Sequence, residues 1–368
     1  MIAAPASVDQ GHLHVNEGPA VKNLGFLSFG HWSRGAGSRI RSASDSVLAT
    51  IDLAVAAEEV GMDGAWIRVH HFEQNLSSPF PLLSAMAART SRIELGTGVI
   101  NMRYENPLYM AELAGTADLV SAGRLQLGVS RGSPEVVADG PGAFGYPLPE
   151  GKLPVEDAAE RIAVFRRAIA GKGVAEPSPA PYGNMPHLVD GLLSIVPVSP
   201  GLSERIWYGA GSIESAKRVG ELGMNLMSST LVLEATGEPF GTIQARQIEA
   251  YREAFKAAGH GREPRVSVSR SILPITTAED NAYFGAIELE ESMGGGGDQI
   301  GIIDNTRATF GRTYVGAPDK IAAELAKDEG IAAADTLLIT VPSQIGVEHN
   351  AHSFEVIVKD VAPAVGWR

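Results

Sequence analysis

The sequence predicts a (β/α)8 TIM barrel, an α/β fold, with long insertion loops. Eight short apolar runs alternate with segments whose apolar residues recur every three or four positions, which is helical spacing. The runs begin near residues 23, 65, 93, 124, 205, 224, 265 and 336. Eight strands alternating with helices over this length is the pattern of such a barrel. A doubly wound sheet is the alternative, but no Gly-x-Gly-x-x-Gly follows the first run.

Composition excludes several classes of function. The 368 residues include 30 Lys and Arg against 43 Asp and Glu, which gives a formal net charge of −13. Nucleic-acid binding needs clustered basic residues, so we expect no nucleic-acid partner. We also expect no membrane insertion, because no apolar run reaches the roughly 18 residues that would cross a bilayer. The absence of cysteine excludes disulfides, thiolate metal sites and cysteine nucleophiles.

We divide the chain into an N-terminal tail, residues 1–21, and a single barrel domain, residues 22–368. The tail has no basic end followed by an apolar core of the signal-peptide type. We therefore expect a cytoplasmic protein.

Candidate chemical groups collect between residues 61 and 134, where the pattern is β-α-β-α-β. His70 and His71 follow the first of these strands, Gly96-Thr97-Gly98 the second, and Ser130 with Arg131 the third. Carboxyl ends of parallel strands share one face, and that face is where sites form. Neighbouring residues in extended backbone point to opposite sides, so the two histidines are not expected to bind one metal. One of them is a candidate acid–base group, with a structural hydrogen-bonding role as the alternative.

A second pattern predicts an anion site. The apolar run at 205–208 is followed by Gly211, Ser212 and Ser215, which open a predicted helix. The N–H groups and the positive end of the dipole at a helix start bind anions, although such small-residue turns also serve close packing. Arg131 would clamp a phosphate at the same end of the barrel, or else form a surface salt bridge. Glu214 would repel a phosphate, so we expect it to face away.

Other segments carry weaker signals. His349 and His352 are three residues apart on the last predicted helix, but no third ligand is near in the sequence, so no metal site is predicted. Residues 171–202 contain six prolines and are predicted to be irregular. The loops at 30–41, 134–154 and 291–312 are expected to set substrate specificity; the glycine run 294–297 is either a plain loop or a lid.

The ordered set of motifs resembles the bacterial luciferase-like flavin monooxygenase family. The resemblance is dense from residue 54 to 134 and thinner at 211–223, 315–318 and 334–363. The motifs that carry it are residues 57–66 (AEEVGMDGAW), 70–72 (HHF), 78–79 (SP), 87–97 (AARTSRIELGT), 106–107 (NP), 111–112 (AE), 118–125 (DLVSAGRL) and 128–132 (GVSRG).

The resemblance implies a barrel that binds reduced FMN, supplied by a separate flavin reductase. Dioxygen would add to the flavin, and the peroxyflavin would oxidise a small organic substrate, classically an aldehyde, so the enzyme would be a monooxygenase acting on paired donors with O2. By position, His70 corresponds to the catalytic histidine. The cofactor-binding residues implied are Thr97, Gly98, Arg131, Gly211, Ser212 and Ser215. The family also implies a bulge at the end of the third strand with a non-proline cis peptide at Gly98-Val99, and a homodimer formed through helices near 79–88 and 107–121.

Two departures from the family pattern matter. The acidic residue that usually precedes the histidine pair is Val69 here, which removes a partner for the histidine. The reactive cysteine of luciferase catalytic subunits is Ser130, so light emission is not expected. Two alternatives stay open: an oxidoreductase that uses deazaflavin F420 on the same barrel, and a non-catalytic partner subunit of the luciferase type.

Overall fold

The computed structural model describes residues 22–132, 135–179, 187–228, 230–303 and 306–367. The predicted tail, residues 1–21, lies outside this part of the chain.

Eight parallel strands close into a barrel, as predicted. Each strand pairs with the next in the order β1, β2, β3, β4, β8, β9, and β11, β15 and β1 complete the ring. Closure depends on the pairing of β9 with β11, in which Leu226 lies opposite Val266. The barrel strands are β1 (Asn23–Ser28), β2 (Gly64–Ile67), β3 (Glu94–Asn101), β4 (Leu125–Ser130), β8 (Ile206–Ala210), β9 (Asn225–Ser228), β11 (Val266–Pro274) and β15 (Thr336–Val341).

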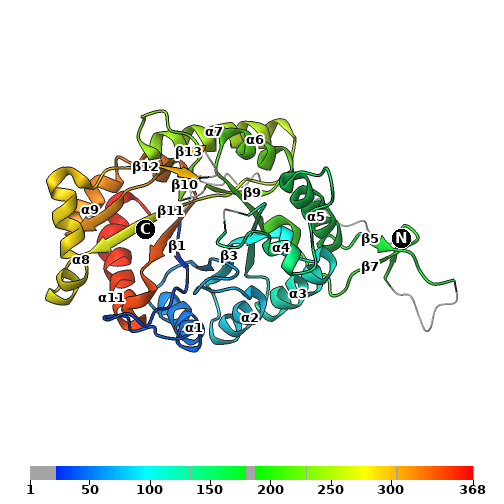
Figure 1. Cartoon of the computed structure of the whole chain (residues 1–368), viewed down its shortest axis with the longest axis horizontal. Helices are drawn as coiled ribbons and strands as arrows, with labels where there is room; N and C mark the ends of the chain where they lie inside the picture. Colours follow the sequence, from blue (N-terminus) through cyan, green and yellow to red (C-terminus); the bar gives the residue numbers. More distant parts are fainter. Residues whose placement is uncertain (1–21, 133–134, 180–186, 229, 304–305, 368) are drawn as a thin grey trace, which may run out of the picture.

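Helices surround the barrel on all sides (Figure 1). The ring comprises α1 (Ala43–Glu59), α2 (Pro79–Arg89), α3 (Pro107–Val120), α5 (Pro154–Ile169), α6 (Ile213–Glu221), α7 (Phe240–Ala257), α9 (Pro318–Leu325) and α11 (Val347–Val356). None of the helices in the described part of the chain is long and apolar enough to cross a membrane.

The main core lies between the strands and this ring. Alternate residues of each strand face outward; Phe26 of β1, for example, stacks on Phe354 of α11 with ring centroids 5.3 Å apart. Burying an aromatic or branched side chain of this size contributes about 1.5–3 kcal/mol. Because the period of a strand is two, the residues between these outward-facing ones must face into the barrel.

Local sequence signals fix where helices begin. Asn106 precedes α3, and its side-chain oxygen accepts the backbone N–H groups of Leu108 at 3.0 Å and Tyr109 at 3.1 Å. Pro107 occupies the first helical position, where its missing N–H costs nothing. The same proline signal opens α2, α5 and α9.

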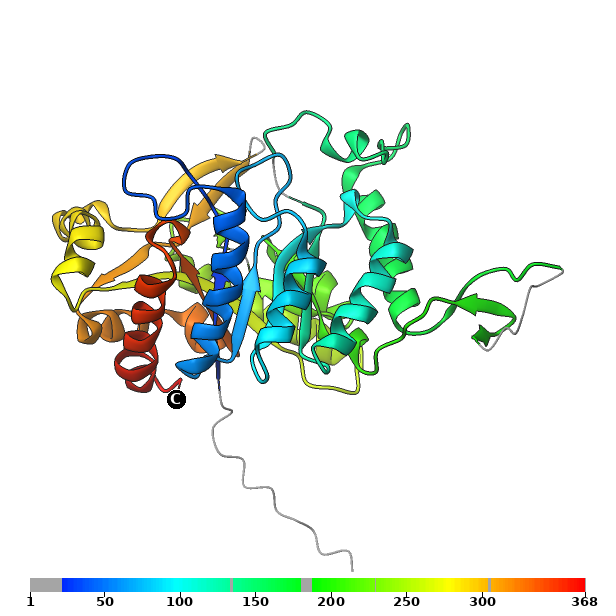
Figure 2. The same cartoon turned by 90° about the horizontal axis from the view of Figure 1, so that it is seen from below.

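Three segments gather at the carboxyl ends of the barrel strands, an end that we call the mouth. In Figure 2 they lie at the top: the loop after β1 in dark blue, the teal segment after β4 that contains α4 (Gly140–Ala143), and the orange hairpin of β12 (Gln299–Ile303) and β13 (Thr306–Phe310). β13 also pairs with β10 (Leu231–Val232), which follows β9. The prediction of a loop at 291–312 is therefore wrong for much of this segment: it begins as a π-helical turn (Glu291–Gly295) and continues as this hairpin, which joins a small antiparallel sheet.

A second small sheet projects from the side of the molecule (Figures 1 and 2). It consists of β5 (Gly173–Ala175), β6 (Leu188–Val189) and β7 (Leu192–Ser194) in antiparallel pairing. The expectation of an irregular segment at 171–202 was wrong for these residues, because strands of two or three residues are too short to show a periodic pattern.

The remaining elements extend the barrel wall. β14 (Thr313–Gly316) pairs in parallel with the carboxyl half of β11. α8 (Ala278–Glu290) follows β11, and α10 (Glu329–Ala333) precedes β15.

Candidate functional site

The lower part of the barrel is filled, so a ligand can enter only from the mouth. Inward-facing residues form an apolar cluster of Leu27, Trp66, Trp207, Met227 and Leu338, in which the two indole rings meet edge to face at 5.3 Å. Beneath them a polar chain runs from Trp207 through Gln126 and Glu94 to Arg265, with distances of 2.8, 2.9 and 2.8 Å.

Above the cluster, the wall is built from small residues. A Cβ at Gly98 would lie 3.0 Å from Leu27 and 3.3 Å from Met227, and one at Gly209 would lie 3.3 Å from Val99. The pairing of β3 with β4 shifts between Thr97 and Ile100, and the Gly98-Val99 peptide is cis, so the bulge and the cis bond expected from the resemblance are both confirmed.

Thr97 is fully buried within this bulge. Its hydroxyl donates to the carbonyl of Gly128 at 2.9 Å and accepts the N–H of Gly128 at 3.0 Å. Both interactions tie β3 to β4. Because its hydroxyl is used in these two hydrogen bonds, Thr97 could contact a ligand only through its backbone.

Arg131 and the start of α6 lie on neighbouring strands at the same rim. β4 pairs with β8, with Val129 opposite Tyr208, and Arg131 follows two residues later, as Ala210 follows Tyr208. Burial raises the pKa of the Tyr208 phenol, and the charges of Arg131 and Arg218 and a hydrogen bond from the Arg131 backbone oppose this rise. Both arginine side chains are exposed.

Ser212 is the N-cap of α6. Its hydroxyl accepts the N–H of Ser215 at 3.3 Å, and the Ser215 hydroxyl donates to the Ser212 carbonyl at 3.3 Å. The carbonyl of Gly211 accepts the N–H of Leu233 at 2.7 Å. Glu214 faces solvent with 84% of its side chain exposed, and it pairs with Lys217 at 3.2 Å. This agrees with the expectation that its negative charge faces away from an anion site.

A carboxylate already occupies this helix start. Glu234, in the segment after β10, accepts the backbone N–H of Ile213, the first residue of α6, at 3.3 Å. Sequence reasoning missed this residue because it lies 21 positions away in a segment without a motif. An N–H group that attracts a carboxylate is also suited to a phosphate.

The adjacent histidines diverge, as extended backbone requires. His70 makes its polar contacts with Arg68 and Glu73, whereas His71 is buried and stacks on Tyr104 with ring centroids 4.1 Å apart. Burial and the charge of Arg68 lower the pKa of His70, and the carboxylates of Glu73 and Glu135 partly offset this.

The hydrogen bonds of His70 define its tautomer. Arg68 Nε donates to His70 Nε2 at 2.7 Å, so this nitrogen must be an acceptor. The ring proton of neutral His70 then resides on Nδ1, which lies 3.6 Å from a carboxylate oxygen of Glu73. The partner that Val69 cannot supply is thus provided three residues further along the chain.

A further polar group joins the mouth from the segment after β4. Glu135 accepts a hydrogen bond from the Tyr104 hydroxyl and another from Asn101 Nδ2 at 3.1 Å. Burial and Glu135 raise the pKa of Tyr104. Burial lowers the pKa of His71, which Glu135 partly raises again. Sequence analysis did not find this network, since its members come from three separate segments.

Within the described ranges, no group of three or more His, Cys, Asp or Glu could hold a metal ion. His349 and His352 instead share one carboxylate, that of Asp280, at 3.3 and 3.4 Å.

Comparison with known proteins adds to this geometry. The family model described as luciferase-like monooxygenase matches residues 25–284. The chain belongs to the luciferase-like monooxygenase family.

Individual relatives of this luciferase-like chain use different cofactors. It is 23% identical over 327 residues to limonene 1,2-monooxygenase of Rhodococcus erythropolis, covering 85% of this chain and 80% of the relative. It is 32% identical over 220 residues to F420-dependent glucose-6-phosphate dehydrogenase of Kineococcus radiotolerans, covering 54% and 61%. The oxygenating constituent of 3,6-diketocamphane monooxygenase from Pseudomonas putida, solved with FMN, shares the fold with a TM-score of 0.66 at 18% identity, covering 93% of this chain and 98% of that one.

One observation supports a fit between the residues of this luciferase-like barrel and a flavin or deazaflavin. The backbone N–H at the start of α6 already binds a carboxylate, so the position favours the negative charge of a phosphate.

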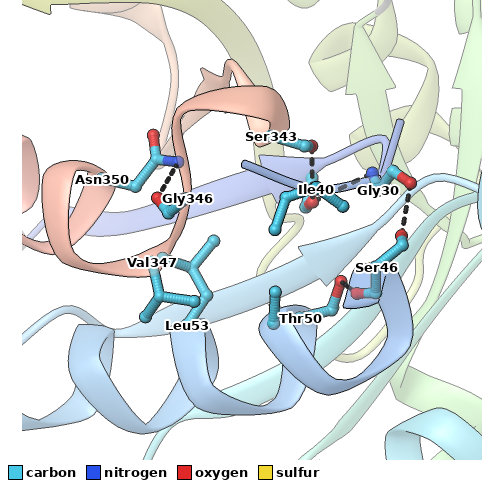
Figure 3. Close-up of a pocket in the computed structure, with 11 residues that line it drawn as sticks. Gly30, Ile40, Ser46, Thr50, Leu53, Ser343, Gly346, Val347 and Asn350 are labelled. Atoms are coloured by element: carbon cyan, nitrogen blue, oxygen red, sulfur yellow. Dashed lines mark hydrogen bonds between the residues drawn. The ribbon is translucent and has the colours of Figure 1, made fainter. Parts of the chain in front are cut away.

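A separate cavity lies outside the barrel wall of the luciferase-like fold (Figure 3). Its lining comes from β1, α1 and the start of α11, and includes Ser46, Thr50 and Asn350. The hydroxyls of Ser46 and Thr50 donate to backbone carbonyls. The lining also includes Ser28 at the end of β1, Gly30 in the loop that follows it and Ser343 after β15, and we assign no ligand to this cavity.

Proposed function

We propose that this luciferase-like protein is a flavin-dependent monooxygenase that binds reduced FMN at the mouth and uses O2 to oxidise a small organic substrate. The reduced flavin would come from a separate reductase. The observation that carries the proposal is that Arg131 and the Ser212-capped start of α6 lie at one rim, on neighbouring strands.

The phosphate would be held by charge and by backbone N–H groups together. Arg131 supplies a permanent positive charge with a planar set of donors. The start of α6 supplies the positive end of a helix dipole, and the hydroxyls of Ser212 and Ser215 lie in its first turn. A chain with a net charge of −13 needs such local groups to attract an anion.

The ring would lie over the glycine-lined wall beside His70. When bound, the reduced ring supplies the electrons for the reaction with O2. His70 is neutral near pH 7 because burial and Arg68 lower its pKa, so it can accept or share a proton without first losing one. Phe144, which packs on His71 and Tyr104, would limit the access of water from one side.

Cofactor choice is tested by thermal unfolding. A ligand that binds only the folded state raises the melting temperature with concentration. We expect FMN to stabilise the purified protein and F420 not to do so. Stabilisation by F420 alone would replace the proposal with an F420-dependent oxidoreductase, and stabilisation by neither would favour a non-catalytic partner subunit.

Two substitutions test the residue roles. Arg131→Ala should weaken FMN binding about tenfold or more, since a charge-assisted contact to phosphate is lost. His70→Ala should leave the FMN dissociation constant nearly unchanged while it lowers turnover of a bound substrate. Arg89→Ala is the control, because this exposed arginine lies on α2, away from the mouth. Unchanged FMN affinity in Arg131→Ala would contradict the phosphate assignment.

A further inference from the structure

Arg68 occupies an unusual position at the mouth. It follows β2 directly and stands two residues after Trp66, a member of the inward-facing cluster. Its guanidinium carbon lies 5.1 Å from the ring centroid of Phe29, which packs on the same cluster. The side chain is half-buried. Arg68 therefore lies above the apolar filling of the barrel, on the side where a ligand would enter.

One backbone hydrogen bond and two side-chain contacts hold Arg68 in place. The backbone N–H of Arg68 donates to the carbonyl of Ser28 at 2.8 Å, Nε donates to His70 Nε2 at 2.7 Å, and the guanidinium carbon lies over the ring of Phe29. These contacts use one of the three guanidinium nitrogens. Within the described residues, the two terminal nitrogens form no hydrogen bond and no ion pair with a carboxylate.

This arrangement leaves a positive charge only partly compensated. Burial lowers the pKa of Arg68, and the charge of Glu73 partly restores it from beyond ion-pairing distance. A charge withdrawn from water is stabilised by a partner that hydrogen-bonds to it. The two free nitrogens of a fixed guanidinium match the two oxygens of a carboxylate, which can accept both hydrogen bonds at once.

We propose that Arg68 is an anion receptor that selects ligands with a planar, singly charged group such as a carboxylate. The receptor is distinct from the proposed phosphate site, because β3 lies between β2, which Arg68 follows, and β4, which Arg131 follows. The anion belongs either to the organic substrate or to the negatively charged ring of the reduced flavin. This inference rests on the proposed function for the identity of the reaction, but not for the binding of the anion.

The test measures binding rather than turnover. The probes are benzoate, its neutral counterpart benzamide, oxidised FMN and anaerobically reduced FMN. The variants are Arg68→Met and Arg68→Lys. The first keeps the bulk of the side chain, and the second keeps the charge but not the planar pair of terminal nitrogens. Arg89→Met, at an exposed arginine of α2 away from the mouth, is the control for a general loss of positive charge. The melting temperature of each variant reports on folding.

If the substrate supplies the anion, Arg68→Met lowers benzoate affinity about tenfold or more, Arg68→Lys lowers it less, and benzamide and both forms of FMN are unaffected. If the flavin ring supplies the anion, Arg68→Met weakens the binding of reduced FMN more than the binding of oxidised FMN. An equal loss for oxidised and reduced FMN, or no change with any probe, overturns the proposal. If the wild-type protein binds benzoate, loses that binding in Arg68→Met and binds no flavin, the result contradicts the proposed function but not the assignment of Arg68 as an anion receptor.

Discussion

Glu234 should compete with the cofactor phosphate, and its removal should tighten FMN binding. Its carboxylate accepts the N–H of Ile213 at 3.3 Å, at the helix start where we propose the phosphate to bind. Two like charges on the order of 5 Å apart, at an effective dielectric constant of about 40, repel each other by about 1–2 kcal/mol. Glu234→Gln removes the charge and keeps an acceptor oxygen, so we expect FMN to bind about 5–30-fold more tightly.

The dissociation constant can be measured by quenching of flavin fluorescence at two salt concentrations. The matched control is Glu214→Gln, whose carboxylate belongs to the same helix start but faces solvent beside Lys217. We expect the control to change FMN affinity less than about twofold, since exposed charges are screened. Weaker or unchanged FMN binding in Glu234→Gln would show that the phosphate does not use this end of α6.

Three further predictions concern other parts of the molecule. Burial raises the pKa of the Glu58 carboxyl, but hydrogen bonds from the turn before β3 lower it by more, and the resulting pKa is about 2. Glu58→Gln should therefore lower the free energy of unfolding, measured in urea at pH 7, by about 1–2 kcal/mol. This loss of stability should shrink as the pH falls from 4.5 towards 2, because the wild-type carboxylate gains its proton in that range. A difference in stability between wild type and variant that stays constant with pH would contradict this prediction. Glu135→Gln should lower the pKa of both His70 and His71 in NMR titrations, because Glu135 raises each, whereas Glu150→Gln, in the same segment, should not. Leu119→Lys should convert the expected homodimer to monomer in sedimentation, since this α3 residue is 51% exposed; a dimer that persists would place the interface elsewhere.

The barrel could be predicted because its signals are local and repeated. Each strand is a short apolar run, and each helix shows apolar residues at three- and four-residue spacing, so all eight barrel strands were found near their observed starts. The small sheets were missed for the opposite reason. β10 has two residues, and its partner is nearly eighty residues away, with Leu231 opposite Phe310. Neither length nor periodicity can reveal such a pairing.

In the candidate site, too, features with a local sequence signal were predicted and contacts between distant segments were not. Positions at strand ends were predicted because parallel strands bring their carboxyl ends together, which applies to His70, Arg131 and Ser212. The partners that tune them were not predicted. Glu73 reaches His70 through a turn, and Glu135 reaches Tyr104 from another segment. These contacts depend on backbone conformations that no motif encodes.

The two proposed anion receptors can be separated by their energetic coupling. Arg131 and Arg68 share no contact among the described residues and lie on strands separated by β3. Independent sites give additive losses, within roughly 0.5 kcal/mol. If the substrate brings its own anion, the Arg131→Ala/Arg68→Met double variant should bind FMN as weakly as Arg131→Ala and benzoate as weakly as Arg68→Met. If both arginines instead bind one reduced flavin, each substitution weakens that single ligand, and the double variant must lose both contributions together.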